Sequence, residues 1–288
     1  MSEATAKPPA SFGVPAPPEL KDKVFDALAE KAELPLRAMI VLGLLAGAYI
    51  GFGGLFAIIA LTGAESLPYG LGQVVAGLVF AMGLGLVMIA GAELFTGNTM
   101  MLAGVVAGRI ALPRAAKALA IVYAANLAGS LILAAVVYGA GLHETRDGAV
   151  GRTAIELARS KTELAFGATV ASGILANMLV CLAVWCAYAG ETVTQKMAGL
   201  TLPVAAFVAA GLEHSVANMY LLPYAWLVQA GTGDGQGPLT LVGLLGNLLP
   251  ATLGNILGGM LIGTAYGLAF PSAPGEGDET TTESGRAA

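Results

Sequence analysis

Long apolar blocks separated by short polar loops make up most of the chain. A helix of about 20 apolar residues crosses the hydrocarbon core of a bilayer. Windows of that length predict six spans, at residues 36–61, 71–106, 113–140, 164–189, 197–230 and 239–270. We therefore expect an all-α, polytopic membrane protein with six transmembrane helices.

Two of the six spans are interrupted near their middles by similar polar runs, GAELFTGN at residues 91–98 and GLEHSVAN at residues 211–218. In both runs a Gly stands two positions before a Glu and an Asn five positions after it, and the copies lie 120 positions apart. Lipid satisfies no polar group, so such residues must face protein or a water-filled cavity. The repeat predicts two broken helices that face each other along a solute path.

Three spans with a break in the middle one are followed by three more of the same pattern. Because each half has an odd number of spans, the two halves must have inverted topology. Inverted repeats with discontinuous helices bind solute at their interface, where half-helix N-termini present free N–H groups and partial positive charge. We expect two inverted three-helix repeats, with the second and fifth helices broken, and a site that favours an anion.

The composition excludes an ordinary soluble domain. The chain is 56% hydrophobic and 11% charged, and its mean hydropathy is +0.76, so too little polar surface remains to face water. Forty glycines favour close helix packing. The net charge of −5 is carried by the ends and loops and implies no nucleic-acid partner.

The distribution of Lys and Arg predicts that both termini are cytoplasmic, in a multi-pass protein of the cell inner membrane. The N-terminal arm and the second and fourth loops hold Lys21, Lys23, Lys31, Arg37, Arg109, Arg114, Lys117 and Lys196. The loops on the opposite side hold Arg146, Arg152, Arg159 and Lys161, all in the third loop, which is therefore an exception to the excess of positive charge on the cytoplasmic side. The first 35 residues lack the apolar core of a cleaved signal peptide.

Four segments follow from these patterns. Residues 1–18 are rich in Pro, Ala and Ser and are expected to be disordered, as is the acidic tail 271–288. Residues 19–35 predict an amphipathic cytoplasmic helix, and residues 36–270 form the transmembrane domain. The amphipathic helix could lie on the membrane, pack beneath a neighbouring subunit or occlude the inner mouth.

His214 is the candidate for chemistry, because it is the one histidine inside a span; His143 falls in a loop. Its protonation could be coupled to the entry of an anion, and the alternative is a packed imidazole bonded to a backbone carbonyl. Glu213 and Glu93 are costly to bury and need partners. Lys161 either attracts anions or pairs with Glu213, and such pairing could simply hold the broken helices.

Intramembrane amides are most often helix-to-helix hydrogen-bonding groups, and Asn177 is expected near His214 together with Thr96. Asn98, Asn218 and Asn255 are three further intramembrane amides. Cys181 and Cys186 lie five positions apart on different faces of one helix, which excludes a bond between them and any metal cluster. No cofactor is predicted.

The runs GAELFTGN, GILANMLVCLAVW from Gly173, LEHSVANMY from Leu212 and GNLLPATLGNILGG from Gly246 resemble the formate/nitrite transporter family. The resemblance covers about residues 20–270. It implies an aquaporin-like protomer of six helices, a homopentamer in the lipid bilayer, and one pore through each protomer.

The resemblance also implies roles for individual residues. The pore histidine falls on His214, the loop threonine on Thr96, the supporting asparagine on Asn177 and the vestibule lysine on Lys161, with Glu213 and Asn218 beside them. Two hydrophobic slits would bracket the histidine. One would be lined by Phe80, Leu84 and Phe207, and the other by Leu94 with Tyr220 or a neighbour. Gly97 and Asn98 depart from some relatives, which carry Ser and another small residue there.

An anion loses its hydration in such a slit and a neutral acid loses far less, so proton-linked transport of a small weak-acid anion is predicted. The resemblance places formate first because of the EHSVANMYLLP stretch from Glu213. Nitrite, hydrosulfide, acetate and lactate remain alternatives, as does a neutral-solute channel in which His214 merely packs. A membrane anchor that ligates haem through two histidines needs a second one inside a span. An enzyme is not expected, because Ser215 directly follows His214 and adjacent side chains on a helix do not face each other.

Overall fold

The computed structural model describes residues 13–233 and 237–270, and within these ranges the regular structure is helical, with no strand. The helices are α1 (Pro17–Ala32), α2 (Leu36–Leu61), η1 (Ala64–Ser66), α3 (Tyr69–Ala90), α4 (Phe95–Asn98), α5 (Met101–Val106), α6 (Leu112–Gly139), η2 (Leu142–Glu144), α7 (Ala149–Thr162), α8 (Phe166–Ala189), α9 (Val193–Ala209), α10 (Ser215–Thr232) and α11 (Leu241–Ala269). The prediction of an all-α protein is confirmed. The predicted tail 271–288 and residues 1–12 of the predicted arm lie outside the described residues.

Five described helices, α2, α3, α6, α8 and α11, are long and apolar enough to cross a membrane. They are packed into one bundle, in which α2 lies against α3 and α6, and α8 lies against α9 and α11. Small residues permit this contact. A Cβ atom at Gly47 of α2 would overlap the backbone of Asn126 in α6, and one at Gly254 of α11 would overlap the backbone of Val170 in α8.

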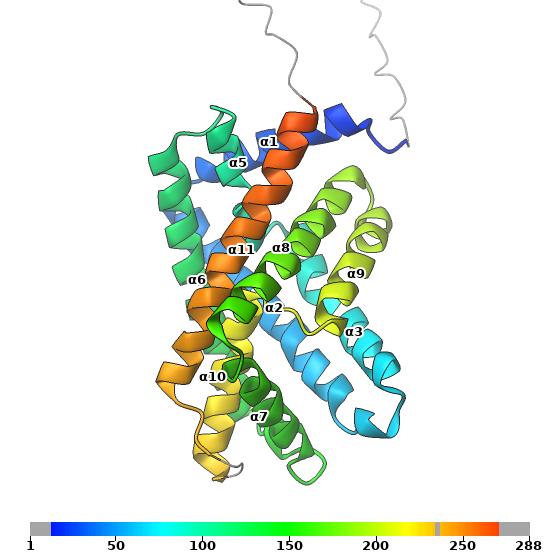
Figure 1. Ribbon diagram of the computed structural model, residues 1–288, viewed down its shortest axis with the longest axis vertical. Helices are drawn as coiled ribbons and strands as arrows, with labels where there is room; N and C mark the ends of the chain where they lie inside the picture. The colour runs from blue at the N-terminus through cyan, green and yellow to red at the C-terminus, as the bar shows by residue number, and fades with distance from the viewer. Residues whose placement is uncertain (1–12, 234–236, 271–288) are drawn as a thin grey trace, which may run out of the picture.

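Two shorter helices cover opposite ends of the bundle. In Figure 1, α1 crosses one end of the bundle and α7 lies at the other. The apolar face of α1, with Val24, Phe25 and Leu28, is buried against α5, α6 and α8. In the same way, Val150, Ala154 and Ile155 of α7 are buried, largely against α10.

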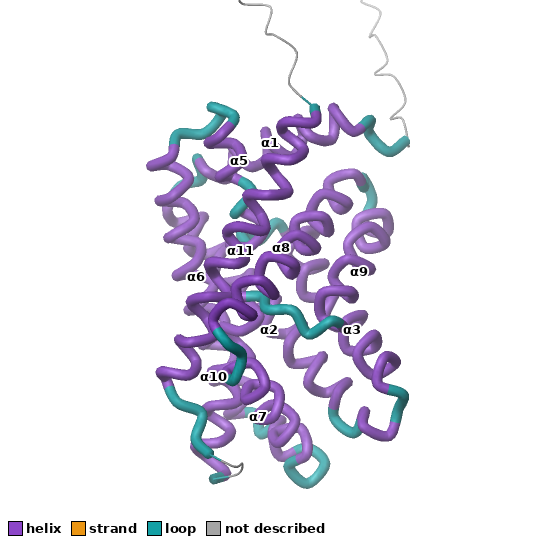
Figure 2. The backbone as a smooth tube through the Cα atoms, viewed as in Figure 1, coloured by secondary structure: helices purple, strands orange, loops and turns teal. Residues whose placement is uncertain are grey.

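The chain leaves the helical path at two places within the bundle. α3 ends at Gly91 and α9 ends before Gly211, and both glycines have positive φ, 74° and 67°. The next N–H bonds back across the turn in each case, from Ala92 to the carbonyl of Val87 and from Leu212 to that of Phe207, both at 3.0 Å. Four residues, 91–94, lie outside helix between α3 and α4, and five, 210–214, between α9 and α10. Figure 2 shows the α9–α10 connection crossing the middle of the bundle rather than an end.

Candidate functional site

His214 lies in the extended segment just before α10, with 2% of its surface exposed. Its Nδ1 accepts a hydrogen bond of 3.0 Å from the backbone N–H of Ala217, so the ring caps α10. A neutral imidazole has one N–H, and an accepting Nδ1 puts that hydrogen on Nε2. The ring therefore offers Nε2–H as a donor.

The partner of Nε2 is Thr96, from the other break. Thr96 Oγ1 lies 2.9 Å from His214 Nε2, and both residues are buried. Asn177 stands behind Thr96 rather than against the ring. Its Nδ2 donates to the carbonyl of Thr96 at 3.1 Å and to Thr99 Oγ1 at 2.9 Å. Of the two residues expected near His214, Thr96 touches it and Asn177 holds Thr96.

Glu213 is fully buried and satisfied by three side chains. Lys161 Nζ donates to Oε1 at 2.8 Å, while Asn218 and Asn247 donate to Oε2 at 2.6 and 3.0 Å. Lys161 comes from the last turn of α7, and its side chain is 10% exposed. Lys161 therefore forms the ion pair with Glu213 that was one of its two predicted roles, and it also lines a cavity.

A matching arrangement surrounds Glu93 at the first break. Lys31 Nζ from α1 donates to Oε1 at 2.6 Å, and Asn98 donates to Oε2 at 2.7 Å. Lys31 was not among the site residues expected from the sequence. The available signal was spacing, since Lys31 and Lys161 lie 130 positions apart, close to the spacing of the two breaks.

Asn126 and Asn255 support the two breaks with corresponding hydrogen bonds. The Oδ1 of Asn126 accepts from the N–H of Phe95 at 2.9 Å, and that of Asn255 accepts from the N–H of Ser215 at 2.8 Å. The Nδ2 of each also donates to the carbonyl of the nearby Glu, at 2.9 Å in both cases. These amides satisfy backbone groups that no helix satisfies.

Two separate cavities enter the bundle from opposite ends, and His214 lines the first of them but not the second. The first, here named the Lys161 cavity, has a volume of about 270 Å³ and is lined by Lys161, Glu213, His214, Phe80, Phe207 and Asn218, among others. The second, here named the Lys31 cavity, has about 210 Å³ and is lined by Lys31, Glu93, Asn98, Leu84, Leu94 and Tyr188, among others. Each cavity thus joins a buried ion pair to apolar side chains.

A sequence profile described as formate/nitrite transporter matches residues 18–268. The chain belongs to the formate/nitrite transporter family. It is 36% identical over 242 residues to the formate channel FocA of Escherichia coli K12, covering 80% of this chain and 85% of that protein. It is 38% identical over 256 residues to a probable formate transporter of Methanothermobacter thermautotrophicus, covering 83% and 91%.

Solved structures agree. A pentameric formate channel with formate bound matches with a TM-score of 0.74 and 34% identity, covering 82% of this chain and 98% of that one. An ion channel of the same family matches with a TM-score of 0.77 and 35% identity, covering 88% and 99%. The resemblance read from the sequence is confirmed, and the chain is an integral, multi-pass membrane protein. These relatives are described as channels or transporters, in line with the expectation that the chain is not an enzyme.

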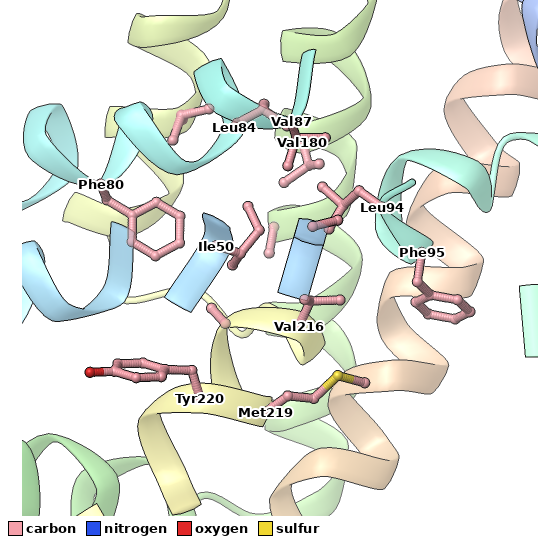
Figure 3. Close-up of a cluster of buried hydrophobic side chains, with 14 of the residues drawn as sticks. Ile50, Phe80, Leu84, Val87, Leu94, Phe95, Val180, Val216, Met219 and Tyr220 are labelled. Atoms are coloured by element: carbon pink, nitrogen blue, oxygen red, sulfur yellow. The ribbon is translucent and has the colours of Figure 1, made fainter. Parts of the chain in front are cut away.

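In this member of the formate/nitrite transporter family, apolar side chains separate the two cavities. Phe80 lines the Lys161 cavity, and Leu84, one turn further along α3, lines the Lys31 cavity. The ring of Phe207 packs against Phe80 with centroids 5.6 Å apart and against the His214 ring at 5.5 Å. Figure 3 shows Phe80 and Leu84 on one helix and Leu94 across from them, with Ile50 between.

The grouping of these side chains differs from the expected one. Leu84 lies with Leu94 at the Lys31 cavity rather than with Phe80 and Phe207, because one helical turn carries it towards the other end. Tyr220 lines neither of these two cavities. Its ring packs against Gly51 and Gly54 of α2, which have no side chains in the way. The periodicity of the α10 sequence does not show which of its residues face these glycines.

Metal chemistry finds no support in the described part of the chain, where no group of three or more His, Cys, Asp or Glu side chains is placed to hold an ion. Cys181 is buried, Cys186 is exposed, and both are free thiols. The site can therefore offer hydrogen bonds, charge and an apolar constriction.

Proposed function

We propose that this protein moves formate together with a proton across the cell inner membrane, through a pore in each protomer of a homopentamer. The observation that carries the proposal is the pairing of His214 Nε2 with Thr96 Oγ1 at 2.9 Å, together with two cavities that have one lysine each, one of which is lined by His214. The formate named in the descriptions of its relatives supports the choice of solute.

The proposed architecture is six membrane crossings in two inverted, aquaporin-like repeats, with the second and fifth crossings broken and both termini cytoplasmic. The corresponding bonds at Glu93 and Glu213 support the repeat. The inversion is supported by the positions of α1 and α7 at opposite ends of the bundle. On this topology the Lys31 cavity is cytoplasmic and the Lys161 cavity faces outward.

The lysines draw the anion into each cavity. An ammonium group in a partly enclosed, low-dielectric space raises the local concentration of anions. Glu213 offsets part of the charge of Lys161, and two asparagine N–H groups in turn engage the carboxylate of Glu213. The lysine therefore keeps a net attraction for a small anion.

The apolar constriction selects against charge. Moving an ion from water into an apolar slit removes its hydration at a high free-energy cost, which a few dipoles do not restore, whereas a neutral acid loses far less. Formate thus takes up a proton from cavity water, crosses as formic acid past Phe80, Leu84, Leu94 and Phe207, and releases the proton in the other cavity.

His214 assists by donating a hydrogen bond. Its Nδ1 already accepts from Ala217, so a second ring proton would bring two N–H donors face to face and break the cap. The geometry therefore favours a ring that stays neutral and offers Nε2–H to the solute, in exchange for Thr96, over a ring that gives up a proton.

The test is uptake of labelled formate, nitrite and acetate into proteoliposomes at about pH 7.5 and pH 5.5, because the protonated fraction of the acid rises as pH falls towards the ordinary pKa of a carboxyl group. Formate should enter fastest, and faster at the lower pH on the entry side. His214→Ala should lower the rate of formate uptake and alter the selectivity at both pH values, because the Nε2–H donor is lost. Swelling of liposomes in glycerol or urea separates a neutral-solute channel, and swelling without formate uptake would overturn the proposal.

A further inference from the structure

Asn247 of α11 ties three parts of the protein together at the Lys161 cavity. Its Nδ2 donates to the backbone carbonyl of Lys161 at 2.9 Å and to Glu213 Oε2 at 3.0 Å, and its Oδ1 accepts from Asn218 Nδ2 at 2.7 Å. The side chain is 1% exposed, and each of its polar atoms is satisfied. One amide thus joins α11, the end of α7 and the break before α10.

Among the residues that the structure describes, no amide takes this place at the other end of the pathway. Asn126 and Asn255 make corresponding bonds 129 positions apart, and the same offset aligns Asn247 with Ala118, a buried alanine of α6. In the described part of the chain, the carboxylate of Glu93 accepts from Lys31 and Asn98, whereas that of Glu213 accepts from three side chains.

This difference changes the charge balance of the two cavities. Hydrogen bonds to an ionised carboxylate are stronger than neutral ones, and each N–H dipole offsets part of the negative charge. Glu213 has two amide donors on Oε2, whereas Glu93 has one. Glu213 therefore offsets a smaller part of the positive potential of Lys161 than Glu93 offsets of the potential of Lys31. The bond to its carbonyl also fixes the backbone of Lys161 at the end of α7.

We propose that Asn247 is a positioning residue that makes the Lys161 cavity the tighter anion-binding end of the pathway. This inference rests on the proposed transport of formate. It concerns the sidedness of binding, which the proposed function leaves open.

The test measures KM and kcat for labelled formate entering from each face, in proteoliposomes of uniform orientation without a pH or voltage difference. A passive pathway then has equal kcat/KM in both directions, so sidedness appears as a ratio of the two KM values. In the wild type, KM should be lower from the Lys161 face. In Asn247→Ala, the KM ratio should move towards one by roughly threefold to tenfold, the change that the loss of one ordinary hydrogen bond produces.

Asn247→Asp is the second variant, because it keeps the shape of the side chain but removes both N–H donors, and it should shift the ratio in the same direction. Thr252→Ala is the matched control on α11. Thr252 bonds to Tyr123 at 3.1 Å and to the carbonyl of Leu248, and it lines neither cavity, so the ratio should stay unchanged.

The outcomes are distinguishable. Loss of kcat from both faces with both KM values unchanged would mean that Asn247 only supports folding, and would overturn the inference while leaving formate transport intact. Equal KM values from the two faces in the wild type would do the same. Absence of formate uptake by the wild type would overturn the proposed function, and this inference with it.

Discussion

Thr96 Oγ1 lies 2.9 Å from His214 Nε2, and this contact joins the two interrupted segments of the chain, 118 residues apart. The two side chains come from corresponding regions of the two breaks but differ in chemistry. The position that matches His214 in the first break is Leu94, which has no side-chain cap to offer α4. The centre is therefore asymmetric, because the first break supplies the hydroxyl of Thr96, whereas the second supplies the imidazole of His214, which also caps α10.

Replacement of His214 by Asn should separate these two roles. Asn is a favourable N-cap residue, so His214→Asn should keep the fold, while its shorter side chain should leave Thr96 without a partner. We expect normal assembly by size-exclusion chromatography, and a lower rate and altered selectivity of formate uptake.

His214→Ala is the comparison, because it also loses the cap and should lower the unfolding free energy by a further 0.5–2 kcal/mol, roughly. The melting temperature of the purified pentamer distinguishes the two variants. Proton-coupled flux in His214→Asn identical to that of the wild type would rule out a role for the ring in transport.

Much of the fold was accessible from the sequence because hydropathy is a local property. Apolar blocks predicted the long helices, and α2 begins and ends where its block does. The close packing of Tyr220 against Gly51 and Gly54 depends on which face of α10 meets α2, and no single-sequence period encodes that choice. The same limit explains the position of Leu84. It lies one turn of α3 beyond Phe80 and therefore lines the Lys31 cavity rather than the Lys161 cavity.

Glycines at the breaks provide a second prediction. Gly91 and Gly211 have positive φ and open space around the Cβ position, so an added methyl group meets backbone strain rather than a clash. Gly91→Ala and Gly211→Ala should each lower the unfolding free energy by about 1–2 kcal/mol, measured by thermal or denaturant unfolding in detergent. Gly246→Ala in α11, where space is also open and φ is helical, is the control and should be neutral or slightly stabilising.

Only part of the site could be predicted from the sequence. His214, Glu213 and Thr96 stand in the polar runs at the two breaks. Asn247 stands in the run from Gly246, but nothing in that run marks it as a partner of Glu213, and Lys31 stands in none of the quoted runs. Lys31 and Asn247 reach their Glu partners from distant elements, over 62 and 34 residues. A polar residue on an amphipathic helix such as α1 is expected to face water, so the spacing between Lys31 and Lys161 was the one sequence signal that Lys31 has a buried partner.

The Lys31–Glu93 pair should be needed for stability. Removing one partner of a buried ion pair leaves an uncompensated charge and typically costs about 3–5 kcal/mol, whereas replacing both partners is far less harmful. Lys31→Met should therefore lower the melting temperature strongly, and Lys31→Met with Glu93→Gln should recover most of it. The loss of stability should be smaller than this range, because the side chain of Lys31 is 24% exposed and water screens part of its interaction with Glu93. A double variant as unstable as the single one would contradict a pairing role.

The anchorage of α1 gives a prediction about pH. Asp22 of α1 bonds to Lys21 and to Arg109, which follows α5, and these cations hold the pKa of Asp22 below its ordinary value of 3.8, against a smaller opposing effect of burial. A carboxyl group with a lowered folded-state pKa stabilises the fold above its unfolded-state pKa, and that contribution is lost only as pH falls through the folded value. The bond to Arg109 should therefore persist unchanged from pH 7 to pH 5.

Protection of α1 from limited proteolysis should be equal at these two pH values in the wild type and lower at both in Asp22→Asn, with Glu163→Gln on the opposite end as the control. A loss of wild-type protection between pH 7 and pH 5 would show that another group controls the docking of α1.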